Sequence, residues 1–278
     1  MGRRESVAGG DQQYLLEQYG DASGLEIRLN LYRKYRTALV GWFPWLAGQV
    51  DWPPRGAVLE VGCGLGSLWV EAASRLPSTL RLTLTDLSPA MVAIGSDRVR
   101  GLGKYAAVRA EDADAEQLPF EDRSFDVVVA NHVLYHTNPA RAVPELARVL
   151  RDEGLLVAST NGPCDHVVEL SELSAAVFGD ASASEALEVF SSVTGEPIVK
   201  GSFGNVERRN YEDELWCTDP HEVVVFITST RPGEHASPTQ LDQLRSATRS
   251  RFDAGGGVYT LSKEAVVFLC RSPHRERP

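Results

Sequence analysis

The sequence predicts an α/β fold with a doubly wound, mainly parallel sheet. Strand-like and helix-like segments alternate from residue 58 to residue 159, a rhythm typical of parallel sheets covered by helices on both faces. The run FDVVVA at residues 125–130 is almost wholly apolar, as expected of a strand that is buried on both sides. A glycine-rich turn at residues 62–66 joins a buried strand to a helix, which in open α/β sheets is a place for nucleotide-like ligands.

The elements of this central unit follow from hydrophobic runs and from glycine and proline breaks. The predicted strands cover residues 58–61, 80–84, 105–109, 125–130 and 155–159. The predicted helices cover residues 68–76, 89–99 and 139–150. Ser88-Pro89 marks the start of the second helix, because proline is well tolerated in the first helical turn.

The flanking regions have a different rhythm. Residues 14–46 show helical spacing of apolar side chains, Leu31 and Leu39 among them, interrupted near residues 20–24. After residue 160 we expect an inserted helical cap, and further elements follow it towards the C-terminus. The cap helices are predicted at residues 165–178 and 184–193, followed by a strand region at 203–217, helices at 220–228 and 241–252, and a terminal hairpin of 258–261 with 265–270. The chain is accordingly divided into residues 1–52, 53–164, 165–219 and 220–278.

Composition limits the functional classes. The 278 residues carry a net charge of −10, from 28 basic and 38 acidic side chains, which disfavours a nucleic-acid partner because phosphate attraction dominates that affinity. Four widely spaced cysteines, without a CxxC pair or a Cys/His cluster, predict no metal site and a reducing, cytoplasmic location. We find neither an apolar run of ~18 residues nor the apolar core of a signal peptide. We expect no membrane partner, and a monomer or homodimer.

Four motifs in the central unit resemble those of class I S-adenosylmethionine-dependent methyltransferases. They are LEVGCGLGS at residues 59–67, LTDLSPAM at 84–91, DAEQLPF with SFDV at 114–127, and NHVLYH at 131–136. Together they cover about residues 57–160 in the order of that family, and they most resemble its small-molecule, natural-product subgroup. The resemblance implies a Rossmann-like seven-stranded sheet with an N-terminal helical lid, and S-adenosyl-L-methionine as cofactor.

The resemblance also assigns cofactor contacts. The glycine turn has no Cβ atoms to keep the ligand from the backbone, and an acid inside the preceding strand suits a cationic cofactor. The predicted cofactor-binding residues are Tyr19, Arg28, Glu60, Gly62, Cys63, Gly64, Gly66, Asp86, Leu87, Met91, Ala113, Asp114, Ala115 and Asn131.

Five of these assignments have alternatives. For Glu60 the alternative is a surface residue at a strand edge, and for Tyr19 it is ordinary helix packing. Asp86 ends the second strand, where a carboxylate can accept both ribose hydroxyls; the alternative is an acid that opposes a helix dipole. Asp114 corresponds to the acid near the adenine amino group, although Asp112 lies only two positions away. Arg28 is expected to hold the cofactor carboxylate as a bidentate fork, or else to pack on its helix.

Catalysis and acceptor binding are marked less clearly. His136 and His132 follow the fourth strand, and either imidazole can act as a general base near pH 7; the alternative is a structural hydrogen bond. We expect in-line methyl transfer to N, O or C of a small aromatic or apolar secondary metabolite, without a metal. The predicted acceptor contacts are Tyr14, Phe178, Phe203 and Trp216.

Three other functions are weighed against this prediction. An NAD-dependent oxidoreductase needs G-x-G-x-x-G or a final Ala, but Ser67 or Trp69 falls at the last position, depending on the starting glycine. A non-catalytic S-adenosylmethionine-binding regulator has the same cofactor motifs. An RNA methyltransferase is disfavoured by the acidic charge and by the lack of a basic domain.

Overall fold

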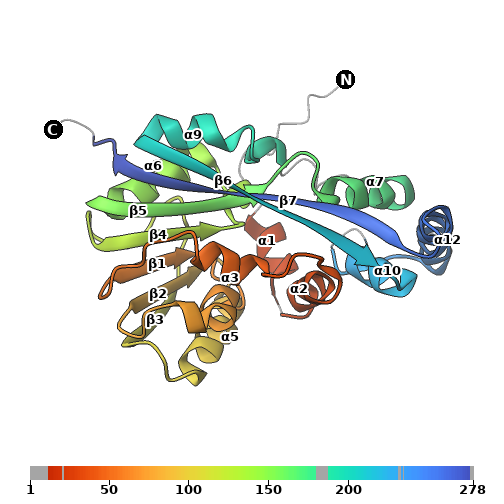
Figure 1. The fold of residues 1–278 in the computed structure, drawn as a ribbon, viewed down its shortest axis with the longest axis horizontal. Coiled ribbons are helices and arrows are strands. Elements are labelled where there is room, and N and C mark those ends of the chain that lie inside the picture. Colours follow the sequence, from red (N-terminus) through yellow and green to blue (C-terminus); the bar gives the residue numbers. More distant parts are fainter. Residues whose placement is uncertain (1–11, 21, 180–186, 231–232, 234, 276–278) are drawn as a thin grey trace.

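The computed structural model describes residues 12–20, 22–179, 187–230, 233 and 235–275, which fold around one seven-stranded sheet (Figure 1). Its strand order is β3-β2-β1-β4-β5-β7-β6. The first five strands run parallel, β7 is antiparallel to β5, and β6 is antiparallel to β7. The mainly parallel α/β fold is therefore confirmed. The strands are β1 (Ala57–Val61), β2 (Arg81–Asp86), β3 (Ala107–Asp112), β4 (Phe125–Asn131), β5 (Leu150–Asn161), β6 (Phe203–Cys217) and β7 (Tyr259–Pro273).

Helices cover both faces of the sheet. Val128 of β4 belongs to a core cluster with side chains of α6 and α9, whereas its neighbour Val129 belongs to a second cluster with α3, α4 and α5. This alternation follows from the period of two in a strand. The helices of these two layers are α3 (Trp42–Ala47), α4 (Ser67–Glu71), α5 (Pro89–Gly101), α6 (Pro139–Val149) and α9 (Gly195–Ser202). Two short 3₁₀ turns, η1 (Ala73–Arg75) and η2 (Leu134–His136), complete the core unit.

Four helices begin with the same two-residue signal. A capping side chain accepts a hydrogen bond from a backbone N–H of the first turn, and proline occupies the next position. This arrangement satisfies an N–H that the helix itself leaves unpaired. The capping residues are Ser88, Asn138, Asp219 and Ser237.

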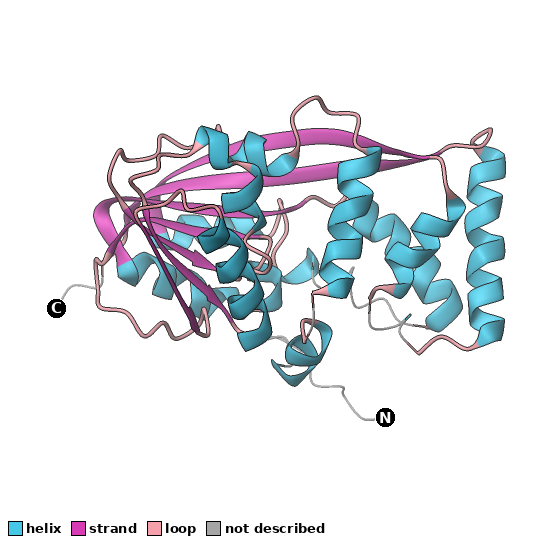
Figure 2. Ribbon diagram, turned by 90° about the horizontal axis from the view of Figure 1, so that it is seen from below, coloured by secondary structure: helices cyan, strands magenta, loops and turns pink. Residues whose placement is uncertain are grey.

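A third cluster lies at one end of the molecule, where the long strands β6 and β7 extend past the rest of the sheet (Figures 1 and 2). It contains Leu31, Leu170, Phe226 and Leu244 together with Leu261 of β7. The helices that meet there are α2 (Ser23–Tyr35), α7 (His166–Phe178), α10 (Pro220–Thr228) and α12 (Pro238–Ala254). The short helix α1 (Gln12–Gln18) precedes them. None of the described helices is long and apolar enough to cross a membrane.

Three predicted elements of the core are wrong in extent. The terminal hairpin is instead one strand, β7, which pairs with β5 and β6 along its two edges. The helix expected over residues 68–76 ends at Glu71 and continues as η1. The strand expected at residues 105–109 begins at Ala107, because Tyr105 packs outside the sheet against Trp69.

The lid and cap also differ from the prediction. Leu39 is not on a helix, because α2 ends at Tyr35 and Leu39 is 97% exposed. The helix expected at residues 184–193 lies partly outside the described residues, and its described part is helical only to residue 189. Helix α9, which contains Gly195 and Pro197, was not predicted, because both residues normally disfavour helix interiors.

Candidate active site

A cavity of about 990 Å³ opens at the carboxyl ends of β1, β2 and β4 and continues towards α7 and α10. Ligands of open α/β sheets bind at this edge. Most residues predicted to contact the cofactor line this cavity, and both candidate histidines do. They are Tyr19, Arg28, Glu60, Gly62, Cys63, Gly64, Asp86, Leu87, Met91, Ala113, Asp114, Ala115, Asn131, His132 and His136.

The glycine turn needs glycine for two reasons. Gly62 and Gly64 have φ values of +64° and +48°, a region that side chains with a Cβ rarely adopt. A Cβ on Gly62 would also lie 2.4 Å from Cγ2 of Val133. The N–H of Cys63 donates to the carbonyl of Thr85, 2.8 Å away, which fixes the turn to the end of β2.

Gly66 lies outside the cavity lining and has a structural position instead. It precedes α4 with φ of +65°, and its Cβ would lie 2.7 Å from Cγ2 of Val99 and 2.9 Å from the carbonyl oxygen of Gly95. Both contacts belong to α5. Gly66 therefore allows the turn to pack closely against α5.

Asp86 is held at the mouth of the glycine turn. Its Oδ2 accepts the N–H of Gly64 at 2.9 Å, and its Oδ1 accepts the N–H of Ser88 at 3.0 Å. Burial raises the pKa of Asp86, and these backbone bonds oppose that shift. Because a carboxylate oxygen accepts more than one hydrogen bond, each oxygen retains capacity for a ribose hydroxyl.

Glu60 is a buried acid, 2% exposed, in the middle of the sheet. Its Oε2 accepts the indole N–H of Trp69 at 2.5 Å. Burial raises its pKa to about 8, with a further contribution from Asp86, and the bond from Trp69 opposes the shift. A cation beside it would favour the ionised form.

We expect cofactor binding to release a proton from Glu60. With a pKa of about 8, Glu60 of the free protein is mostly protonated near pH 6.5. Its predicted partner, the cofactor's ammonium group, favours the carboxylate, so we expect affinity to rise with pH up to about 8. Calorimetric titration at pH 6.5 in phosphate and in Tris, whose ionisation enthalpies differ, would measure the release. Equal heats in the two buffers would contradict the assignment, and Glu60→Gln should remove the difference.

The same shift predicts how unliganded stability depends on pH. Because its folded pKa of about 8 exceeds the ordinary value of 4.5 for a glutamate, Glu60 binds more protons in the folded state than in the unfolded state between these values. Its contribution to stability therefore falls as pH rises through that window.

Helix α2 closes one side of the cavity and is tied to the core. Arg28 donates to the carbonyl of Ser229 at 2.9 Å, and its other terminal nitrogen, Nη2, is buried without a hydrogen-bond partner in the described chain. Arg33 pairs with Glu71 of α4 at 2.7 Å. Arg28 thus offers a buried guanidinium donor at the cavity wall, a suitable partner for a carboxylate.

Asp114, rather than Asp112, lines the cavity; Asp112 is exposed at the end of β3. The Oδ1 of Asp114 accepts the N–H of Glu116 at 2.9 Å. This turn fixes the position of the acid that the sequence assigned to the adenine end.

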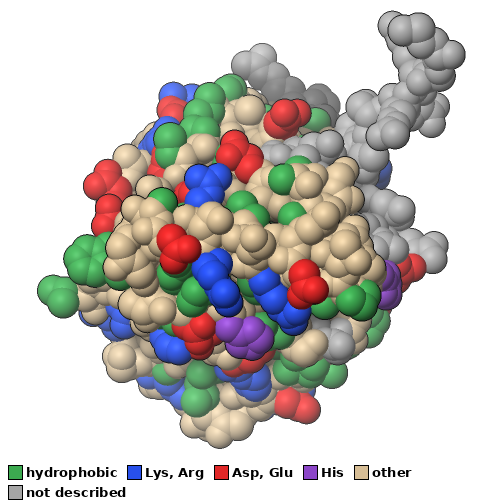
Figure 3. All heavy atoms as spheres, turned by 90° about the vertical axis from the view of Figure 1, so that its right-hand side faces the viewer, with side chains coloured by type: hydrophobic (Ala, Val, Ile, Leu, Met, Phe, Trp, Pro, Cys, Tyr) green, Lys and Arg blue, Asp and Glu red, His purple; other side chains and the backbone are tan. Residues whose placement is uncertain are grey.

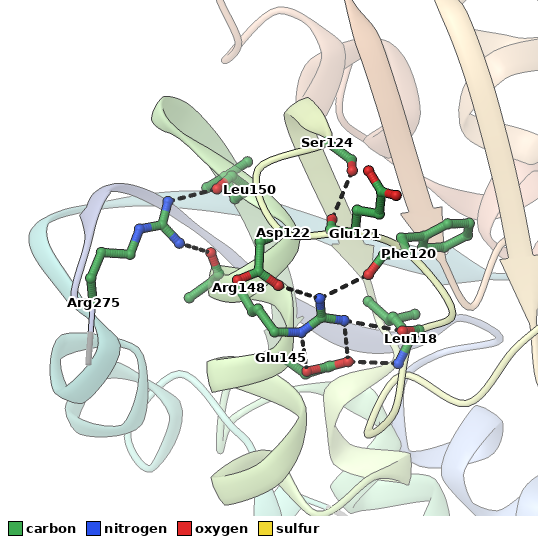
Figure 4. A network of polar contacts seen from close by, with 10 residues as sticks. Leu118, Phe120, Glu121, Asp122, Ser124, Glu145, Arg148, Leu150 and Arg275 are labelled. Carbon is green, nitrogen blue, oxygen red and sulfur yellow. Dashed lines mark hydrogen bonds and ion pairs between the residues drawn. The ribbon is translucent and has the colours of Figure 1, made fainter. Parts of the chain in front are cut away.

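Arg148 of α6 fixes residues 118–122, the segment that follows Asp114 in the sequence (Figure 4). Its guanidinium donates to the carbonyls of Phe120 and Leu118 at 2.8 and 3.0 Å and pairs with Glu145 at 2.7 Å. Glu145 in turn accepts the N–H of Leu118 at 2.8 Å. The hydrogen bonds from Arg148 lower the pKa of Glu145, so this anchor stays charged around neutral pH.

The two histidines lie in an aromatic environment. Nε2 of His136 is 3.1 Å from the hydroxyl of Tyr19, and the His132 ring lies 5.0 Å from that of Trp42. Burial lowers the pKa of His136 to about 4, aided by Arg28, and that of His132 to about 3, aided by Lys263. Both imidazoles are therefore neutral at pH 7 and can accept a proton, although such low pKa values make them weak bases.

Asn131 is held between the lid and the sheet. Its Oδ1 accepts the indole N–H of Trp42 at 3.0 Å and the hydroxyl of Ser159 at 2.8 Å. These two bonds fix the amide at the end of β4.

The predicted acceptor aromatics lie elsewhere. Phe203 is in the core under α6 and α9, Phe178 packs among α7, α10 and α12, and Trp216 is 56% exposed on edge strand β6. The side chain of Tyr14 lies outside the described residues. Besides Tyr19, the aromatic residues that line the cavity are Tyr32, Trp42, Phe43, Tyr135, Tyr211 and Phe226.

Several polar residues of the far end of the cavity were not predicted. Asn161, Ser171, Ser174 and Lys263 are each less than a tenth exposed and line it. The sequence contained one signal for Lys263. Apolar and polar residues alternate over residues 259–265, and Lys263 stands at one of the positions that alternate inward, two residues after Leu261. Among the described residues, no group of three or more His, Cys, Asp or Glu side chains could hold a metal ion.

Comparisons with known proteins agree with this geometry. Residues 59–158 match the methyltransferase domain model. The chain is 29% identical over 117 residues to the ubiquinone/menaquinone biosynthesis C-methyltransferase UbiE of Geotalea daltonii, covering 42% of this chain and 50% of that one. It is 32% identical over 181 residues to the malonyl-[acyl-carrier protein] O-methyltransferase of Herminiimonas arsenicoxydans, covering 64% and 63%. The chain thus spans about half the length of the first of these curated relatives.

Two solved structures share the fold. Phosphoethanolamine N-methyltransferase 2 of Haemonchus contortus, in complex with S-adenosylhomocysteine, has a TM-score of 0.58 and 19% identity, covering 99% of this chain and 62% of that one. The [4+2]-cyclase SpnF has a TM-score of 0.58 and 16% identity, covering 95% and 97%.

The sheet order, the glycine turn with its two acids, and the domain match define a methyltransferase domain that uses S-adenosylmethionine. Residues 59–158 thus carry a methyltransferase domain, and the chain is similar to S-adenosylmethionine-dependent methyltransferases over this part and beyond it.

Proposed function

We propose that the protein transfers the methyl group of S-adenosylmethionine to a small-molecule acceptor enclosed in the same cavity. The observation that carries this proposal is the continuity of the cavity: its lining runs from Glu60 and Asp86 at one end to Leu170 and Phe226 at the other. Its volume of about 990 Å³ is at the upper end of the range of small-molecule sites, about 300–1,000 Å³.

The residues present fit the cofactor. Asp86 suits the ribose hydroxyls, Glu60 the ammonium group and Asp114 the adenine end, while Leu87 and Met91 offer apolar contact. Arg28 contributes a buried Nη2 without a partner, which suits the carboxylate. The backbone of Gly62 and Gly64 can approach the ligand closely, because no Cβ intervenes.

Cofactor bound here would supply an electrophilic sulfonium methyl. The chain then has to orient the acceptor and exclude water. Helix α2 and Trp42 cover the cavity, and Trp42 is held by its bond to Asn131. We propose that neutral His136, oriented by Tyr19, or His132 receives the acceptor proton where one must leave.

The acceptor side favours a small molecule over a polymer. The walls formed by α7 and α10 enclose it, and the face over α10 and α12 carries acidic and basic side chains side by side rather than a basic patch (Figure 3). We keep a cytoplasmic location in this proposal, supported by four free cysteines. That the acceptor is a secondary metabolite is a prediction that rests on the sequence pattern of the N-terminal lid and the cap.

The fold by itself does not establish methyl transfer, since the [4+2]-cyclase SpnF has a similar fold. Incubating the protein and S-adenosylmethionine with acceptor candidates, and measuring S-adenosylhomocysteine formed, tests the difference. Quinone precursors and malonyl thioesters are the first candidates, in view of the relatives. Cofactor binding without acceptor-dependent turnover across a broad acceptor panel would favour a non-catalytic protein.

A further inference from the structure

Lys263 is a buried cation at the acceptor end of the cavity. It is 7% exposed, lies on β7 and lines the cavity. Its ammonium is 4.6 Å from the centre of the Tyr32 ring, a cation–π contact, and none of the described residues accepts a hydrogen bond from its three N–H donors. No carboxylate among the described residues lies within 4 Å of it.

Two acids in the neighbourhood of Lys263 bind other groups. Asp165 accepts the N–H groups of Val167 and Glu264 at 3.0 and 3.1 Å, and its Oδ1 lies 2.8 Å from Nδ1 of His166. Burial opposes ionisation, but His166 and Lys263 lower the pKa of Asp165. Asp165 therefore offsets the charge of Lys263 from a distance without bonding to it.

Asp213 is the direct cross-strand neighbour of Lys263 in the pairing of β6 with β7. Its Oδ1 accepts the N–H groups of Thr37 and Ala38 at 2.9 and 2.8 Å, and its Oδ2 accepts the hydroxyl of Tyr211 at 3.2 Å. This carboxylate fastens the segment after α2 through these hydrogen bonds, and it forms no ion pair with Lys263 among the described residues.

Further unpaired polar groups line the same cavity. The hydroxyls of Ser171 and Ser174 on one face of α7, and Oδ1 of Asn161 at the end of β5, are buried without partners in the described chain. Since unpaired buried polar groups are costly, these atoms indicate a ligand or water with matching groups. Leu170 and Phe226 supply apolar wall between them.

We propose that the acceptor carries an anionic carboxylate-type group, which Lys263 binds while the apolar body of the acceptor lies against α7 and α10. The inference rests on the proposed function, because it assigns the acceptor half of that cavity. This inference differs from the sequence-based expectation of an aromatic or apolar acceptor, because the acceptor then also carries an anionic group. Lys263 is a specificity residue, and its positive charge also contributes to the lowered pKa of His132.

The test uses the full chain loaded with S-adenosylhomocysteine and two matched probe pairs. They are 4-hydroxybenzoate with 4-hydroxybenzamide, and 2-naphthoate with 2-naphthamide. Ligand-observed NMR titration gives each affinity. In wild type at least one carboxylate should bind about tenfold or more tighter than its amide, as expected for hydrogen bonds to a charged group.

Three variants make the result specific. Lys263→Met should remove the preference, Lys263→Arg should retain most of it, and Lys200→Met should not change it, because Lys200 is on α9 outside the cavity lining. Equal binding of acid and amide in both wild-type pairs, or a preference that survives Lys263→Met, would overturn the inference. Affinity for S-adenosylhomocysteine is measured on the same samples: its absence in wild type would sink the proposed function itself, whereas intact affinity without anion preference would sink only the assignment of Lys263.

Discussion

Replacing Asp86 with alanine is expected to weaken S-adenosylmethionine binding about tenfold to a hundredfold. The change removes the acceptors for the ribose hydroxyls, and hydrogen bonds to a charged group contribute about 1.5–3 kcal/mol. It also removes the bonds that hold the N–H groups of Gly64 and Ser88, so the turn loses an anchor. Isothermal titration calorimetry measures the loss.

Asp112 provides a matched control for this experiment. It pairs with Asp86 in the register of β2 and β3, and it is exposed and outside the cavity lining. Asp112→Ala should bind the cofactor as wild type does. If both alanine variants keep wild-type affinity, the ribose is not at Asp86.

Replacing Gly95 with alanine is expected to lower both stability and cofactor affinity. A Cβ at this position of α5 would lie 2.4 Å from the carbonyl oxygen of Gly64 and 3.1 Å from the nitrogen of Gly66. Backbone atoms of a constrained turn cannot move aside cheaply, and such overpacking typically costs about 1–3 kcal/mol. Urea denaturation gives the loss of unfolding free energy, and calorimetry gives the loss of affinity.

Gly101 of the same helix is the control for Gly95. Nothing lies within 4 Å of a Cβ placed there, and its φ is not in the left-handed region. Gly101→Ala should therefore leave cofactor affinity unchanged and raise stability by up to about 1 kcal/mol, because alanine is the better helix former. The close-packing explanation fails if Gly95→Ala is as stable as Gly101→Ala.

The sequence predicted the parallel core well because its signals are local. Apolar runs such as residues 125–130 and a capping pair such as Ser88-Pro89 determine their own elements. Glu60 lies in the strand directly before the glycine turn, and Asp86 ends the next strand along the chain. In a parallel sheet both positions lie near the turn. Their placement in one cavity therefore followed from sequence order.

The acceptor half could not be predicted in the same way. It is assembled from α7, which precedes the β6–α10 segment, and from β7 near the C-terminus; these parts meet through the antiparallel pairing of β6 with β7 and through packing of α7 against α10 and β7. Aromatic type alone did not separate the core residue Phe203 from the cavity residue Phe226. Lys263 was overlooked because the prediction split β7 into a hairpin, which hid the inward alternation around it.

The most direct measurement is a crystal structure of the protein with S-adenosylhomocysteine. The ribose hydroxyls should lie within hydrogen-bonding distance of Asp86, the amino group near Glu60, and the sulfur should face the part of the cavity that leads to Lys263. A ligand bound elsewhere, or a sulfur directed away from that end, would contradict the account of one cavity shared by cofactor and acceptor.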